Sequence, residues 1–136
     1  MTTRIRRVDY FYTTIGDSPG EAWQLLSQLA ELGVDLLAFT AIPIGVRTQL
    51  TLFPADAARL QNAGKQTGFA LDGPRPAMLV QGDDRMGALA AIHNRLAQAG
   101  VDVFASSGVA DGKGSYGYVV YVRPERFAEA MKALEL

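Results

Sequence analysis

The sequence contains no cysteine and a single histidine, His93, in 136 residues. Without cysteine the chain has no disulfide framework, no thiol nucleophile and no zinc–thiolate site, and a lone histidine does not complete a metal site. Long apolar runs are missing too: none is long enough to span a bilayer, and the N-terminus lacks the apolar core of a signal peptide. We therefore expect a cytoplasmic protein with no cofactor, no metal and no membrane partner.

An excess of charge of one sign is also missing. The chain has 13 basic and 14 acidic residues and a formal net charge of -1. Because nucleic-acid-binding domains carry a basic patch, we expect no nucleic-acid partner. The one basic cluster, Arg4, Arg6 and Arg7, is interpreted as a solvated terminus without a function.

The sequence does contain an internal repeat. Gly100-Val101-Asp102 follows Gly33-Val34-Asp35 at an offset of 100 − 33 = 67 residues, and Asp84 follows Asp17 at the same offset. The apolar stripes of the predicted helices superimpose as well, with Leu25 on Ile92 and Leu29 on Leu96, for example. A module of this size has only a marginal core of its own, so we expect the two copies to share an interface or the chain to form a homodimer.

Hydrophobic periodicity and turn residues predict the order β-α-β-β-α-β for the first copy. Its strands are expected at 8–15, 34–42, 46–52 and 67–72, and its helices at 19–32 and 54–65, with Ser18 as the first N-cap. The second copy has predicted strands at 77–81, 101–106 and 116–122 and helices at 85–99 and from 124. It lacks the last strand, which leaves a sheet edge for a strand from this chain or from a partner to cover.

The predicted fold class is therefore α+β, with two βαββαβ modules in tandem. Modules are expected at residues 1–72 and 77–136. Residues 73–76 form the expected linker, because Pro74 and Pro76 interrupt either kind of regular element.

The two strand-to-helix turns carry a resemblance to a known family. Asp17-Ser18-Pro19-Gly20 and Asp84-Arg85-Met86-Gly87-Ala88-Leu89, each followed by a helix and then Gly-Val-Asp, resemble the ACT domain family, from about residue 6 to residue 134. The resemblance implies two ferredoxin-like modules in tandem, with antiparallel sheets and helices packed on one face. It also implies that they bind small molecules, most often amino acids, and regulate metabolic enzymes or act as a sensor. The ligand-binding residues that it implies are Gly16, Asp17, Ser18, Pro19 and Gly20, and Gly82, Asp83, Asp84, Arg85, Met86 and Gly87. Met86 stands where the first copy has Pro19, so the two sites need not be equivalent.

The chemistry of these turns supports such a site. A glycine ahead of a helix lets a ligand approach the backbone, and free N–H groups with the helix dipole favour a carboxylate. Asp17 and Asp84 would then bind an amino group; the alternative is that both aspartates cap their helices.

Other motifs favour structural roles. Residues 112–119 match the glycine pattern of a phosphate-binding loop, but they open a strand, so a flexible hairpin is expected. Ser106-Ser107 is interpreted as the end of a strand. The Asp83-Asp84 pair is weak evidence for a cation site, and His93 is interpreted as a partly buried structural histidine.

We predict a non-catalytic regulatory or sensor protein that binds an amino acid or a related metabolite at module interfaces and acts on a partner, such as a metabolic enzyme, in trans. Two alternatives remain. One is a small enzyme that uses His93 and a nearby carboxylate as acid and base. The other is an assembly module whose exposed sheet edges recruit an enzyme without any ligand.

Overall fold

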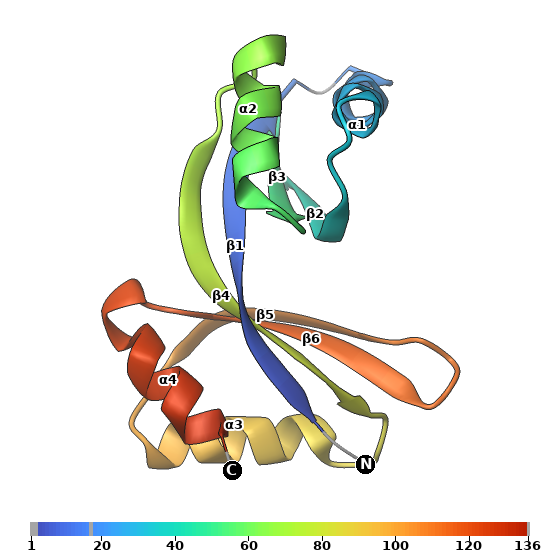
Figure 1. Cartoon of the computed structure of the whole chain (residues 1–136). Coiled ribbons are helices and arrows are strands. Elements are labelled where there is room, and N and C mark those ends of the chain that lie inside the picture. Colours follow the sequence, from blue (N-terminus) through green and yellow to red (C-terminus); the bar gives the residue numbers. More distant parts are fainter. Residues whose placement is uncertain (1–2, 17, 136) are drawn as a thin grey trace. The chain divides into compact units, whose positions relative to one another are not determined.

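The computed structural model describes residues 3–16 and 18–135, and the chain divides into two compact units. The first unit is Asp9–Arg75, and the second unit combines Met1–Val8 with Pro76–Leu136. The elements of the chain are labelled in Figure 1. In chain order they are β1 (Arg4–Ile15), α1 (Glu21–Glu31), β2 (Leu36–Ile44), β3 (Arg47–Pro54), α2 (Ala57–Thr67), β4 (Asp72–Asp83), α3 (Ala88–Gln98), β5 (Val103–Ala110), β6 (Ser115–Val122), the 3₁₀ turn η1 (Pro124–Arg126) and α4 (Phe127–Leu134).

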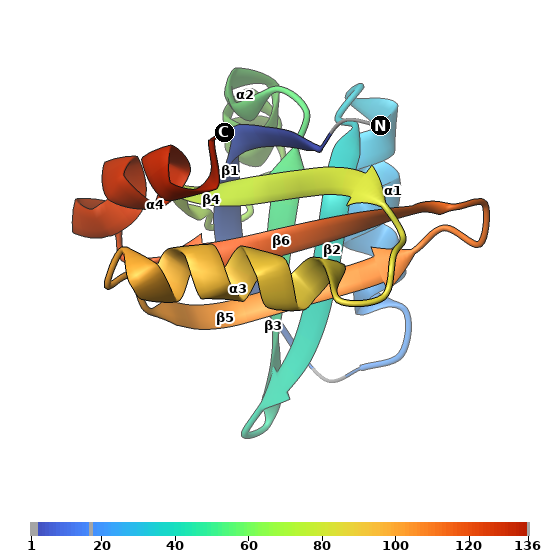
Figure 2. The same ribbon diagram turned by 90° about the horizontal axis from the view of Figure 1, so that it is seen from below.

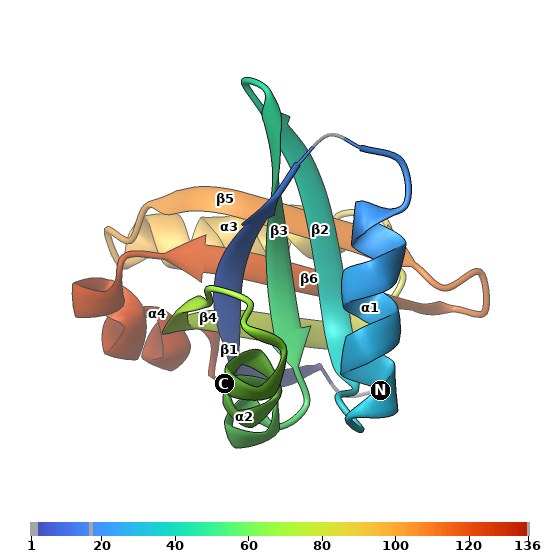
Figure 3. The same ribbon diagram turned by 90° about the horizontal axis from the view of Figure 1, so that it is seen from above.

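The first unit is a sheet in the order β2-β3-β1-β4 with helices α1 and α2 (Figure 3). Strand β3 is antiparallel to both of its neighbours, with Leu52 opposite Phe11 of β1 and Phe39 of β2. The helices turn their apolar stripes onto one face of this sheet. The core consists of Phe11, Leu25, Leu29, Leu50, Leu52, Leu60 and Ala63.

The second unit repeats this arrangement in the order β1-β4-β6-β5. Strand β6 is antiparallel to β4 and β5, and Figures 1 and 2 show α3 and α4 on the same side of these strands. Its core consists of Met78, Val80, Ile92, Leu96, Val101, Tyr116, Tyr118, Val120, Val122, Ala130 and Leu134. The predicted fold class, two ferredoxin-like modules with helices on one face of antiparallel sheets, is confirmed.

The strand that the second copy lacks comes from the start of the chain. Residues 4–8, the first part of β1, belong to the second unit and lie next to β4. Ile5 packs against the core of that unit, and the Arg7 guanidinium lies 5.6 Å from the centroid of the Phe127 ring. The expected strand start at residue 8 is therefore four residues too late, whereas the side chains of Arg4, Arg6 and Arg7 are exposed, as expected for a solvated cluster.

The predicted linker also differs from the structure. Residues 73–76 lie within β4, a single strand that replaces the strands expected at 67–72 and 77–81. Thr67 instead ends α2, and residues 68–71 belong to no strand. Proline is tolerated on an edge strand, where a missing N–H disturbs no ladder, and this part of β4 is the edge of the sheet in the first unit.

None of the helices in the described part of the chain combines the length and the apolar character needed to cross a membrane.

Candidate functional site

The last two residues of β4 and the turn into α3, residues 82–87, which together we call the second turn, border a cavity of about 710 Å³ in the second unit. Of the turn residues singled out from the sequence, Asp83, Arg85, Met86 and Gly87 line this cavity. The remaining walls come from the start of β1, from α3, from Tyr116 of β6 and from the end of α4. Strand β1 is thus part of the cavity wall as well as of the sheet.

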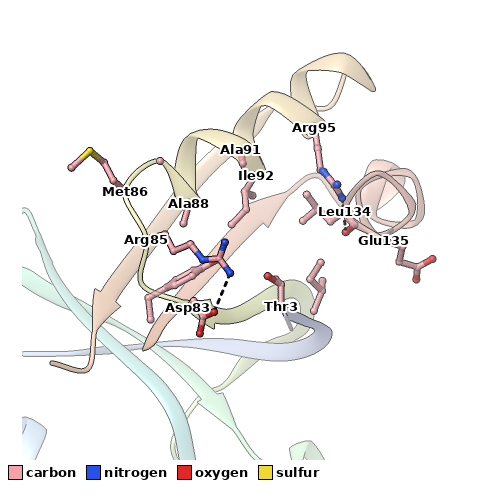
Figure 4. A pocket seen from close by; sticks show the side chains of 13 residues that line it. Thr3, Asp83, Arg85, Met86, Ala88, Ala91, Ile92, Arg95, Leu134 and Glu135 are labelled. Carbon is pink, nitrogen blue, oxygen red and sulfur yellow. Dashed lines mark hydrogen bonds and ion pairs between the residues drawn. The ribbon is translucent and has the colours of Figure 1, made fainter. Parts of the chain in front are cut away.

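Charges of both signs surround this cavity (Figure 4). The Arg85 guanidinium lies 3.2 Å from a carboxylate oxygen of Asp83. Arg95, in the last turn of α3, donates a hydrogen bond of 3.4 Å to the carbonyl oxygen of Leu134. Met86 points away from the cavity in Figure 4, and its side chain is exposed. A cavity with two guanidinium groups, of Arg85 and Arg95, and two carboxylates, of Asp83 and Glu135, at its walls suits a small molecule that carries charges of both signs.

Tyr116 adds a neutral hydroxyl to the wall of this cavity. Burial raises the pKa of the Tyr116 phenol above its ordinary value, because the phenolate is disfavoured where water is excluded. The hydroxyl therefore stays protonated at neutral pH and can donate a hydrogen bond to a ligand.

A second hollow, of about 480 Å³, borders the same turn and is also lined by residues of β5. Asp84 lines this hollow and not the larger cavity, and Arg85 lines both. The backbone N–H of Asp84 donates to the carbonyl oxygen of Gly114, which ties the turn to the β5–β6 hairpin. The second turn is therefore held by the strands of its own unit and is bordered by a hollow on each side.

The first turn, residues 16–20, is arranged differently. The backbone N–H groups of Gly16 and Ser18 each donate a hydrogen bond of 3.1 Å to the carboxylate of Glu21. The two cavities of the first unit that lie along α2, of about 370 and 290 Å³, are lined by none of Gly16, Ser18, Pro19 and Gly20. Asp17 lies outside the described residues. The first turn thus contacts a side chain of the chain itself.

The described residues do not show Asp84 or Ser18 as a helix cap, and the same alternative for Asp17 lies outside the described residues. Helix α1 begins after Gly20 and α3 after Gly87, both with φ near +90° and with no side-chain cap. Glycine adopts this left-handed backbone without strain. Asp84 therefore caps nothing. Gly82, predicted as a site residue, is buried in β4, where an added Cβ would lie 3.1 Å from the Thr3 hydroxyl and 3.3 Å from the Tyr116 ring.

Two residues of this region were missed in the sequence. Arg95 and Glu21 lie outside the glycine turns, but a comparison of the copies would have found them. At the offset of 67, Arg95 corresponds to Gln28 (95 − 67 = 28) and Glu21 to Ala88 (88 − 67 = 21). A charge present in one copy and missing from the other was the available signal.

His93 makes a hydrogen bond of 2.6 Å through Nε2 to the Tyr118 hydroxyl and is half-buried. This contact agrees with the structural role expected for it. Among residues 3–16 and 18–135, no group of three or more histidine, aspartate and glutamate residues is placed to hold a metal ion.

The glycine-rich segment after β5 forms the expected hairpin. The Asp111 carboxylate accepts hydrogen bonds from the N–H groups of Lys113 and Ser115. Ser106 and Ser107 do not end a strand, because β5 continues to Ala110.

The chain resembles several solved structures. No family model matches the sequence, and no curated protein matches it. Protein BT0572 from Bacteroides thetaiotaomicron superimposes with a TM-score of 0.80 at 17% identity, over 97% of this chain and 88% of that one. The regulatory subunit of aspartate kinase from Thermus thermophilus gives a TM-score of 0.70 at 15% identity over 98% and 95% of the two chains. The regulatory subunit of aspartate kinase from Thermus flavus gives a TM-score of 0.64 at 17% identity, over 98% of this chain and 94% of that one.

At these identities the likeness shows the fold. The chain has the tandem ACT-domain fold of the aspartate kinase regulatory subunits over nearly its whole length, as the turn motifs indicated.

Proposed function

We propose that this chain, which has the fold of the aspartate kinase regulatory subunits, is a non-catalytic regulatory or sensor protein that binds an amino acid or a related metabolite at the second turn. The observation that carries the proposal is the cavity of about 710 Å³ bordered by that turn, with Arg85, Arg95 and Asp83 at its walls. This cavity lies within one unit, so the proposed site differs from the module interface that the family resemblance implies.

Each part of an amino acid has a partner in this site. The carboxylate is held by the backbone of the turn and by an arginine, Arg85 or Arg95, because charge-assisted hydrogen bonds are the strongest that a protein offers to an anion. The amino group is held by Asp83, which gives up its ion pair with Arg85 or shares it. Tyr116 donates its hydroxyl to a polar group of the ligand, and Ile5 and Ile92 contact the apolar part.

The signal is a population shift, not bond making. A ligand that bridges the second turn, α3 and the end of α4 favours the arrangement in which these three segments are held together. The ligand raises the affinity for a partner that binds this arrangement more tightly than the alternatives. The partner raises the affinity for the ligand by the same factor. We propose that the partner is a metabolic enzyme on which this chain acts in trans.

We propose a homodimer as the working form. The outer strands β2 and β5 expose large apolar side chains: Ile42 is 51% exposed, Ile44 56%, Phe104 55% and Val109 74%. Edge strands with apolar side chains are prone to associate with another chain.

The test is thermal unfolding of the purified chain against a panel of amino acids, each paired with its own carboxamide, which lacks the carboxylate. A ligand at 100 times its dissociation constant adds about 2.7 kcal/mol of stability, which raises the melting temperature of a chain this size by several degrees. We expect one chemical class of amino acid to give this shift and its carboxamides to give none.

The variants Arg85→Met and Arg95→Met each remove one guanidinium from the cavity, and the variant that lacks the arginine bound to the carboxylate should abolish the shift. Arg123→Met removes the same charge from an exposed position at the far end of β6 and should retain it. If the protein is well folded and no amino acid raises its melting temperature, ligand binding is refuted and the assembly module is favoured. An equal shift with acids and carboxamides would refute recognition of a carboxylate.

A further inference from the structure

The first turn already contacts a carboxylate, which belongs to Glu21. Oε1 of Glu21 accepts from the Gly16 N–H and Oε2 accepts from the Ser18 N–H, each at 3.1 Å. A Cβ added to Gly16 would come within 2.6 Å of Oε2, so the carboxylate lies directly against the turn. Two backbone N–H groups that converge on one carboxylate are the arrangement by which proteins bind anionic ligands.

The second turn differs from the first at the positions that bear on this contact. Ala88 corresponds to Glu21 (88 − 67 = 21), so no carboxylate is available at the start of α3. Arg85 corresponds to Ser18 (85 − 67 = 18) and Arg95 to Gln28 (95 − 67 = 28). The second copy therefore lacks the glutamate at the first helical position, and it gains two guanidinium groups together with the Asp83 carboxylate, which corresponds to Gly16 (83 − 67 = 16) and pairs with Arg85.

These differences in residue type are matched by differences in the contacts of the two turns. Among the described residues, no side chain accepts a hydrogen bond from the backbone N–H groups of residues 84–88. The Asp84 N–H donates to the Gly114 carbonyl and the Ala88 N–H to the Arg85 carbonyl. The second turn borders the cavity of about 710 Å³, and both arginines line it. A cavity, two guanidinium groups and an alanine in place of the glutamate thus coincide in one copy.

We propose that Glu21 is a built-in carboxylate that fills the anion site of the first turn, so that each chain binds an external carboxylate at the second turn alone. The inference rests on the proposed function for its second half, the open site. Its first half, the closed site, rests on the Glu21 hydrogen bonds.

An attached group competes strongly with a free one, because its effective concentration reaches the millimolar range or higher. The first turn of the wild-type chain should therefore bind free acetate at least about tenfold more weakly than the same turn without the Glu21 side chain. The opposite substitution should have the opposite effect: a glutamate placed at position 88 should bind the backbone N–H groups of the second turn as Glu21 binds those of the first.

The experiment is a titration of ¹⁵N-labelled protein with sodium acetate, followed by two-dimensional NMR of the backbone amides, with sodium chloride of equal concentration as the salt control. Three proteins are compared: the wild type, Glu21→Ala and Ala88→Glu. The amides of Gly16 and Ser18 report on the first turn, and those of Arg85 and Gly87 on the second.

We expect saturable shifts of the second-turn amides alone in the wild type, of both turns in Glu21→Ala, and of neither in Ala88→Glu. Because Ala88→Glu changes only the second unit, it tests the inference even where Glu21→Ala weakens the fold of the first.

Saturable shifts of Gly16 and Ser18 in the wild type, equal to those in Glu21→Ala, would overturn the closed site. Unmoved first-turn amides in a folded Glu21→Ala protein would overturn it too. If the second turn alone fails to respond in the wild type, the open site and the proposed function fall, while the role of Glu21 in the first turn stands.

Discussion

Gly73 occupies a position in β4 that no side chain fits. Its φ is +153°, and an added Cβ would lie 2.7 Å from the Tyr10 carbonyl oxygen and 3.2 Å from the Phe11 Cα. Both atoms belong to the backbone of β1, the neighbouring strand, so neither can rotate away as the end of a side chain would. The close approach of two backbones is the reason for glycine here.

We predict that Gly73→Ala lowers the free energy of unfolding by at least about 2 kcal/mol, because it combines an unfavourable φ with overlap against a strand. Urea unfolding followed by circular dichroism measures the effect. The matched control is Gly117→Ala in β6, where an added Cβ meets nothing within 4 Å. It should change stability by less than about 0.5 kcal/mol. Equal stability of the two variants would contradict the proposed overlap.

At the scale of single elements, β1 and β4 are the unusual ones, because each contributes to both units. Residues 4–8 of β1 give the second unit its outer strand, with Val8 buried and Ile5 against the core. Thr3 and Ile5 also line the cavity of the candidate site. The start of the chain therefore stabilises a unit whose other residues begin at position 76.

We predict that deletion of residues 1–8 destabilises the second unit and leaves the first largely intact. The loss of two apolar side chains and a strand ladder should cost at least about 3 kcal/mol. Hydrogen exchange measured by mass spectrometry should show faster exchange in β4 from residue 78 and in β6. Peptides from α1 and β3 should exchange as before.

The control keeps the strand and removes charge only. Arg4→Ala combined with Arg6→Ala changes exposed side chains and should leave the exchange of β4 unchanged. If the double substitution reproduces the effect of the deletion, charge rather than strand pairing explains the role of this segment.

At the scale of the whole molecule, the outer strands favour self-association. Strand β2 is the outer strand of the first unit and β5 that of the second, and the two strands occupy corresponding positions in the repeat. Both expose large apolar side chains. An apolar edge of this kind is stable in water when another chain covers it.

We predict that the wild-type chain is a dimer at micromolar concentration and that Ile42→Lys or Val109→Lys weakens the dimer at least about tenfold, because a buried unpaired ammonium is costly. Light scattering coupled to size-exclusion chromatography measures the mass. Trp23→Lys, at a side chain on α1 that is 71% exposed, should remain dimeric. A monomeric wild type would refute the homodimer, and dissociation by Trp23→Lys alone would move the interface to the helices.

The sequence by itself determined the local structure and the repeat. The positions of Leu25, Leu29, Ile92 and Leu96 predicted which helix faces are buried, and all four side chains are in the cores. The two strand-to-helix turns were also predicted, although the helices begin two and three residues later than expected, after the left-handed backbone of Gly20 and Gly87. These features depend on residues near one another in the chain, so a local pattern is sufficient to reveal them.

Only the tertiary structure decided which strand completes the second unit and which turn borders a cavity. Strand pairing depends on the edges that are free once the modules fold, and residues 4–8 meet β4 across about 70 positions of sequence. The contrast between the turns likewise depends on Glu21 folding back onto Gly16 and on Arg95 reaching the cavity of the second turn. Such contacts are set by packing in three dimensions, and no periodicity in the sequence encodes them.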